Sequence, residues 1–97
     1  MFILLVYDIE LIDENGRQRL NKVAKLCEKN GIRVQNSVFE LNIDNTHFLK
    51  LKNNLEKIIT SNDSIRFYKL GNIDKVNIEI LGKKEKVEII NNENFIF

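Results

Sequence analysis

The chain begins with a strand pattern that is followed by a helix pattern. Residues 2–7 are apolar throughout, which is typical of a strand buried on both faces. The polar stretch 13–15 offers helix N-caps. After it, apolar residues recur at the spacing of one helical stripe, namely Leu20, Val23, Ala24 and Cys27. We expect this helix to end at Asn30, with Gly31 in the left-handed conformation that suits glycine.

The middle of the chain repeats this alternation of strand and helix. Residues 32–43 have a strand pattern, but 35–37 interrupts its phase, so two strands or one sharply bent strand are both open. Asp44 is a candidate N-cap for a second helix. The apolar stripe of that helix consists of Phe48, Leu51, Leu55, Ile58 and Ile59. A polar loop at 60–64 then precedes another strand at 65–70.

The order strand, helix, strand, strand, helix, strand is that of the ferredoxin-like fold. It predicts a single α+β domain over residues 1–97, with its core at about 1–71 and an extra strand or strands in the tail at about 72–97. Both helices would cover one face of an antiparallel sheet. The other face would then need a partner, and a chain of this size gains from pairing with a second copy.

The tail does not fit the ferredoxin-like core. Residues 76–80 alternate like a strand, and the chain ends in the apolar residues 95–97. Such a tail could fold back on its own sheet, or it could add a strand to a neighbour's exposed edge. We predict the second arrangement for the part of the tail up to about residue 82.

The composition is that of an ordinary soluble globular protein, with 43% hydrophobic and 30% charged residues. Cys27 is the single cysteine, which excludes a disulfide framework and a multi-thiolate metal site. The opening apolar run lacks a basic leader and is too short for a membrane span. We therefore expect a cytoplasmic protein without a membrane partner.

The net charge of +1 conceals an uneven distribution. Residues 1–13 carry three acids and no base, whereas residues 14–36 carry six bases and two acids. A basic segment beside an acidic one suits a phosphate-bearing partner and a cation site in the same protein. The alternative is that the basic residues form the solvated face of a helix.

Asp8 is the most informative single residue, because it stands at the carboxyl end of the first strand. Mg²⁺ prefers six oxygen ligands, so one carboxylate cannot hold it well, whereas two copies across a two-fold axis would supply a pair. The alternative role for Asp8 is a strand-end cap or turn residue.

Three arginines and one phenylalanine are candidates for contacts with nucleic acid. Arg17, Arg19 and Arg33 carry guanidinium groups that bind phosphate oxygens in bidentate fashion. Surface salt bridges to Glu10 or Glu14 are the alternative. Phe39 could stack on a base, although its alternation with Leu41 and Ile43 makes core packing its default role.

Three motifs together resemble the signature of the CRISPR-associated endoribonuclease family. They are Val6-Tyr7-Asp8-Ile9, then Arg19-x-x-Lys22-Val23-Ala24-Lys25, then the stretch from Gly31 to Glu40. The resemblance covers residues 2 to about 70, and the stretch 31–40 is its most specific part.

This resemblance implies a homodimer of ferredoxin-like subunits packed sheet to sheet, with Mg²⁺ held between two symmetry-related aspartates. Asp8 matches the metal-binding and catalytic aspartate, and Arg17, Arg19, Arg33 and Phe39 match positions linked to nucleic-acid handling. Family members are described as metal-dependent nucleases on single-stranded RNA or duplex DNA, and as a scaffold for the larger CRISPR integrase during spacer acquisition. The extreme end of the tail would help to dock that integrase.

The residues around Asp8 favour slow cleavage and a dominant scaffold role. Hydrolysis of a phosphodiester generally needs a metal, an activated water and help for the leaving group, but the motif offers one carboxylate without a histidine beside it. Two other functions remain open at this point. One is a toxin-type messenger-RNA ribonuclease of the virulence-associated family, and the other is a ferredoxin-like regulatory module that binds a small ligand between subunits.

Overall fold

The computed structural model describes residues 1–71 and 77–83 of the chain. Its elements confirm the predicted α+β class and the order of strands and helices. They are β1 (Phe2–Asp8), α1 (Gly16–Asn30), β2 (Gly31–Gln35), β3 (Val38–Asn42), α2 (Asn45–Glu56), β4 (Ser64–Lys69) and β5 (Asn77–Gly82). The interruption at 35–37 therefore separates two strands.

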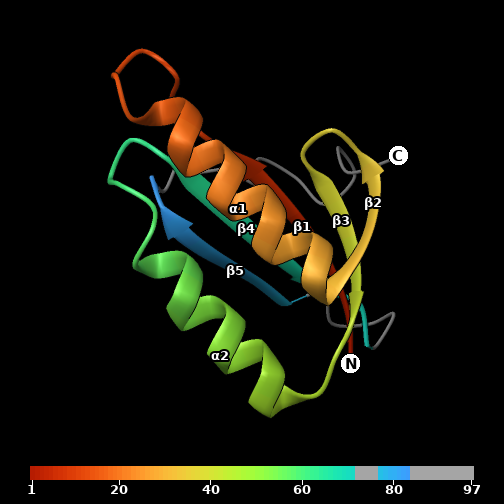
Figure 1. Cartoon of the computed structure of the whole chain (residues 1–97). Coiled ribbons are helices and arrows are strands. Elements are labelled where there is room, and N and C mark those ends of the chain that lie inside the picture. The colour runs from red at the N-terminus through yellow and green to blue at the C-terminus, as the bar shows by residue number, and fades with distance from the viewer. Residues whose placement is uncertain (72–76, 84–97) are drawn as a thin grey trace, which may run out of the picture.

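The strands form one antiparallel sheet in the order β2-β3-β1-β4-β5. The first four strands have the ferredoxin-like arrangement, with β1 in the middle between β3 and β4. Both helices lie on the same face of this sheet, so the opposite face carries no layer of the described chain (Figure 1). The predicted two-layer architecture is confirmed.

The core lies between the sheet and the two helices. It is supplied by alternate residues of the central strands, because successive side chains of a strand point to opposite faces. The fully buried members of this core are Ile3, Leu5, Val23, Cys27, Phe39, Leu55, Ile65 and Phe67. In β1, Tyr7 is also buried, whereas the residues that alternate with Ile3, Leu5 and Tyr7 are not, and Phe2 is 45% exposed. The prediction that β1 is buried on both faces is therefore wrong for the single chain.

Strand β5 pairs with β4 of its own chain, over the register from Ser64↔Gly82 to Lys69↔Asn77. Of the two arrangements considered for the tail, the structure has the one in which it folds back. The prediction that this segment adds to a neighbour's sheet is wrong, since β4 supplies an antiparallel edge within reach of the chain. The expected role of residues 95–97 lies outside the described residues.

The two predicted helix boundaries are found, but one of them has a different physical cause. The Asp44 side chain caps α2 by accepting a hydrogen bond from the His47 backbone N–H at 2.8 Å. Gly31 follows α1 with φ −167°, an extended conformation instead of the predicted left-handed one. Glycine is needed there for space, because a Cβ atom would collide with the Glu40 carbonyl oxygen and the Leu41 side chain.

Neither helix in the described part of the chain has the length and apolar character that a membrane crossing requires.

Cys27 lies fully buried in the core. Burial raises the pKa of the Cys27 thiol to about 12, so this thiol is protonated at neutral pH and packs as a small apolar side chain.

Candidate functional site at the end of strand β1

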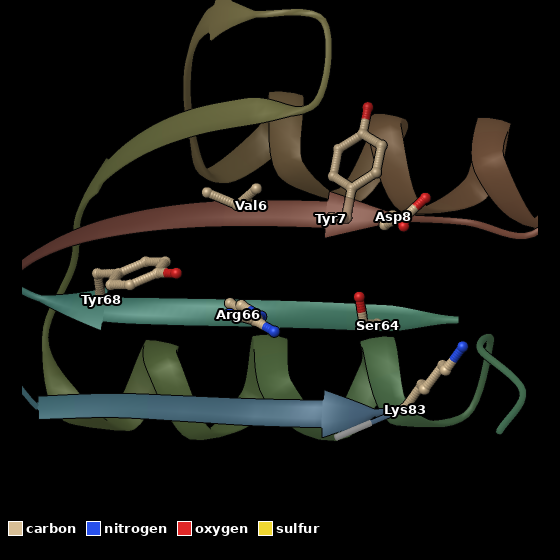
Figure 2. A pocket seen from close by; sticks show the side chains of 7 residues that line it. All are labelled: Val6, Tyr7, Asp8, Ser64, Arg66, Tyr68 and Lys83. Carbon is tan, nitrogen blue, oxygen red and sulfur yellow. The ribbon is translucent and has the colours of Figure 1, made fainter. Parts of the chain in front are cut away.

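Asp8 is the last residue of β1, and its side chain lies on the sheet face opposite the helices (Figure 2). It is exposed, and its carboxylate has no hydrogen-bond or ion-pair partner among the described residues. In the register of β1 and β4, Asp8 stands opposite Ser64. A carboxylate that is exposed, unpaired and fixed by a strand on its backbone side is available to a cation.

A depression of about 300 Å³ surrounds Asp8 on this face of the sheet. Figure 2 shows Asp8 and Ser64 at one end of the paired strands, with Arg66 and then Tyr68 farther along β4. The residues that line it are Val6, Tyr7, Asp8, Ser64, Arg66, Tyr68 and Lys83. The depression thus combines one carboxylate, two hydroxyl groups on β4 and cationic groups within a single open surface.

The residues on the β4 side of this depression were not predicted from the sequence. Ser64, Arg66 and Tyr68 alternate with the buried residues Ile65 and Phe67, so a period of two along β4 was the available signal. What was lacking was the register that sets Ser64 opposite Asp8. That register is a tertiary property, and no local pattern states it.

The oxygen atoms around Asp8 are of the kind that Mg²⁺ prefers as ligands, but one chain supplies few of them. Oxygen ligands are what Mg²⁺ prefers, and one or two carboxylates with several waters suffice to hold it. Within residues 1–71 and 77–83, however, no cluster of three or more histidine, cysteine, aspartate or glutamate side chains is found. One chain therefore offers Asp8 and the Ser64 hydroxyl, and a second copy is needed for a pair of carboxylates.

Arg19 is buried, in contrast to what its candidacy for phosphate binding requires. Its side chain is 10% exposed, and Nε lies 2.8 Å from Oδ2 of the fully buried Asp63. Its two terminal nitrogens donate to both carboxylate oxygens of Asp13 at 2.8 Å. All of the guanidinium nitrogens are therefore engaged within the chain, which raises the pKa of Arg19 above its usual value. Arg19 has a structural role here.

The two carboxylates around Arg19 stay ionised because of these bonds. The hydrogen bond from Arg19 is the main reason that the pKa of Asp13 is lowered. For Asp63, burial acts to raise the pKa, but hydrogen bonds from Arg19, Thr60 and Glu10 outweigh it, so this pKa is also lowered. Arg19 therefore forms its ion pairs with Asp13 and Asp63, and not with Glu10 or Glu14 as the alternative prediction had it.

Arg33 and Phe39 are brought together, because they stand opposite each other in the pairing of β2 with β3. The Arg33 guanidinium carbon lies 5.1 Å from the centre of the Phe39 ring, and Nη2 lies 3.3 Å from Oε1 of Glu28. Phe39 is fully buried and stacks on Tyr7, so its default role in the core is confirmed. Arg33 keeps 42% of its side chain exposed, and Arg17 is exposed on the first turn of α1.

Comparison with known proteins supplies the family. The family model described as CRISPR associated protein Cas2 matches residues 1–78 of the chain. The chain belongs to the Cas2 family. The resemblance seen in the sequence motifs is thereby confirmed, and the match reaches into β5.

Individual Cas2 proteins match over most of their own length. The CRISPR-associated endonuclease Cas2 of Halalkalibacterium halodurans is 42% identical over 90 residues, which is 92% of this chain and 94% of that protein. A CRISPR-associated endoribonuclease Cas2 of Rhodospirillum rubrum is 42% identical over 88 residues, covering 90% of this chain and 93% of its own.

Solved structures agree with the Cas2 assignment. The crystal structure of Streptococcus pyogenes Cas2 matches with a TM-score of 0.67 and 49% identity, over 73% of this chain and 87% of that chain. A hypothetical protein from Thermus thermophilus matches with a TM-score of 0.62 and 29% identity, over 73% of this chain and 82% of its own. The chain therefore has the fold of a solved Cas2 structure.

Proposed function

We propose that this protein is a metal-dependent endonuclease that cleaves phosphodiester bonds in single-stranded RNA or duplex DNA. Its relatives are named endonuclease or endoribonuclease Cas2, and this supports the class of reaction. Support for a site at Asp8 comes from its geometry, since this carboxylate lies at the end of β1 inside an open depression and has no partner among the described residues.

Three residues of the depression would each have a separate role in this reaction. A bound Mg²⁺ would supply positive charge for a phosphate oxygen and acidify a bound water. Asp8 would hold the ion by a carboxylate oxygen. The Ser64 hydroxyl, across the strand pair from Asp8, would orient a water by a hydrogen bond. Arg66 would hold a phosphate oxygen of the nucleic acid with its guanidinium fork.

We further propose that the protein works as a homodimer formed through the open face of the sheet. Support comes from large apolar side chains that the register places on this face, with Phe2 45%, Ile32 71% and Ile78 48% exposed. A second copy there would bring a second Asp8 carboxylate toward the first and complete the donor set.

The small donor set also supports a second role, as a scaffold for the larger CRISPR integrase in spacer acquisition. A site with one carboxylate per subunit cleaves slowly, so assembly with nucleic acid and integrase would be the more important activity. Exposed Arg17 and partly exposed Arg33 are the candidates for contacts with phosphates in that assembly.

The test of the nuclease function is Asp8→Asn, which keeps the shape of the side chain and removes its charge. Magnesium-dependent cleavage of a labelled RNA or DNA should fall by about a hundredfold or more, the size of effect seen when an electrostatic contact to a transition state is lost. Glu56→Gln is the matched control, because Glu56 is an exposed carboxylate at the end of α2, on the other side of the sheet from Asp8. It should cleave at the wild-type rate.

Two results would refute this function. One is undiminished cleavage by Asp8→Asn purified in parallel with the wild type, and the other is wild-type cleavage that persists when EDTA removes the metal.

A further inference from the structure

Asp63 has a buried side chain with an unusually large number of hydrogen bonds, and it lies next to the candidate site without being part of it. It lies in the turn before β4 and is 0% exposed. Its carboxylate accepts five hydrogen bonds from three separate segments of the chain. The donors are Thr60 N and Thr60 Oγ1 at 2.8 and 3.1 Å, Glu10 N at 2.9 Å, and Arg19 Nε and Nη2 at 2.8 and 3.3 Å.

These bonds reach the chain on both sides of the Asp8 site. Glu10, whose backbone N–H is bound to Asp63, stands two residues after Asp8. Ser64, which faces Asp8 across the strand pair, is the residue that follows Asp63. The carboxylate of Asp63 therefore joins the chain that leaves β1 to the chain that enters β4.

Arg19 extends this connection along the loop after β1. Besides its bonds to Asp63, it donates to the Glu10 carbonyl oxygen at 3.1 Å and grips Asp13 with two bonds of 2.8 Å. The loop from Ile9 to Asn15 is thus held at two points against the start of α1. Ile9 is buried in the core, but Glu10 is half-buried and residues 11–15 are exposed, so these bonds fix a stretch that core packing does not hold.

The backbone of Asp63 adds a connection to β5. Its carbonyl oxygen accepts a hydrogen bond from the Lys83 backbone N–H at 2.6 Å. Gly82 makes this approach possible, since its φ is +84° and a Cβ atom there would collide with the same carbonyl oxygen. Lys83 also lines the depression around Asp8, so Asp63 connects three of the segments that form it.

We propose that Asp63 is a positioning residue for Asp8, which it acts on through the Glu10 backbone, the Ser64 backbone and the Arg19 ion pair. The proposal rests on the proposed function of Asp8 as a metal ligand. Asp63 itself is buried and touches neither metal nor nucleic acid. Its role is to fix the direction of the Asp8 carboxylate and its distance from the Ser64 hydroxyl, as groups behind a metal ligand commonly do.

The test compares two variants of the full chain at a temperature where both are folded. Asp63→Asn keeps the shape but loses the charge that Arg19 requires. Leu41→Ala is the control, because Leu41 is a buried residue opposite Ile3, at the other end of β1 from Asp8. Two quantities are measured by NMR: the broadening of the Asp8 and Ser64 amide signals by Mn²⁺, and the hydrogen exchange of the Glu10 and Ser64 amides without metal.

In Asp63→Asn, the affinity for Mn²⁺ should fall by about tenfold to a hundredfold, the range for groups that support a metal ligand. Exchange at Glu10 and Ser64 should be faster than in Leu41→Ala. The control should keep wild-type Mn²⁺ affinity, because it loses stability at a distance from the site.

The outcomes separate this proposal from the proposed function. If the wild type shows no Mn²⁺ broadening at Asp8, the metal function fails, and the exchange data alone decide whether Asp63 fixes this backbone. If the wild type and Asp63→Asn bind Mn²⁺ equally and their exchange matches the control, Asp63 is not a positioning residue. Should Asp63→Asn fail to fold, Arg19→Lys replaces it, since lysine keeps the charge but cannot reach Asp13, Glu10 and Asp63 together. An unchanged Mn²⁺ affinity in Arg19→Lys would likewise overturn the proposal.

Discussion

The two faces of the sheet are built from the same strands but have opposite characters. On the helix-covered face, Ile3, Leu5 and Phe67 are fully buried. On the open face of the same sheet, β1 carries the exposed Asp8 and the 45% exposed Phe2. Since successive residues of a strand alternate between faces, a single run of sequence supplies stability on one side and an available surface on the other.

This difference explains why the candidate chemistry lies where it does. A charged group on the helix-covered face has to be paired, as Arg19 and Asp63 are at the edge of that layer. Asp8 on the open face has no partner among the described residues and is free to bind a cation. Function can therefore be placed on the open face without a cost to the core.

The strongest test of this contrast is Phe39→Ala on the helix-covered face. Phe39 is fully buried and stacks on Tyr7 with ring centres 6.1 Å apart. Its removal should lower the free energy of unfolding by about 3–5 kcal/mol, the usual loss for a buried phenylalanine. Urea unfolding at the lowest workable protein concentration would measure this change.

Phe2→Ala is the matched change on the open face and should cost only about 1 kcal/mol, the centre of the range for point mutants. Equal losses for the two variants would mean that both faces of the single subunit are equally packed, and the contrast would be wrong.

A smaller effect on folding, but a decisive effect on assembly, is expected for Leu4→Glu. Leu4 stands near the middle of the open face, between Glu40 and Tyr68 in the register. A charge there should prevent a second copy from packing, because an unpaired carboxylate would be buried in the interface. Light scattering should give the 11.4 kDa mass of one chain for the variant and twice that mass for the wild type.

Leu49→Glu is the control for this prediction, because Leu49 lies on α2 and is 48% exposed. It should remain a dimer. A wild type with the mass of one chain would remove the dimer, and the shared metal site with it.

The sequence predicted the layout of the fold because that layout follows from local patterns. The apolar stripe of Val23 and Cys27, the cap at Asp44 and the alternation around Phe39 each specify an element within a few residues. Their order was enough to identify the ferredoxin-like arrangement. The resemblance of motifs then identified the family, which the family model confirms.

The Asp63 connections could not be predicted, for a physical reason. Their donors Arg19 and Glu10 stand 44 and 53 residues away in sequence, and a polar turn such as 60–64 gives no sign of which strand end it approaches. The position of β5 in the sheet is a similar case. A strand pattern shows that a segment can pair in a sheet, but it does not show which strand edge the segment pairs with. Arginines are mostly exposed, so the sequence predicts a phosphate contact for Arg19 and gives no sign that its side chain is buried.

The smallest expected effects concern the arginines, and they test whether exposure separates binding residues from structural ones. Arg17 and Arg33 are exposed, and the Arg33 ion pair with Glu28 is of the surface kind that contributes little to stability. Arg17→Ala and Arg33→Ala should each leave unfolding almost unchanged. Each should also reduce the slope of log affinity for duplex DNA against log salt by about one unit, because one phosphate contact is lost.

Arg19→Ala should have the opposite pair of effects: it should destabilise the fold and leave the salt slope of the folded protein unchanged. Unchanged slopes for Arg17→Ala and Arg33→Ala would show that exposure alone does not make these arginines part of a nucleic-acid interface.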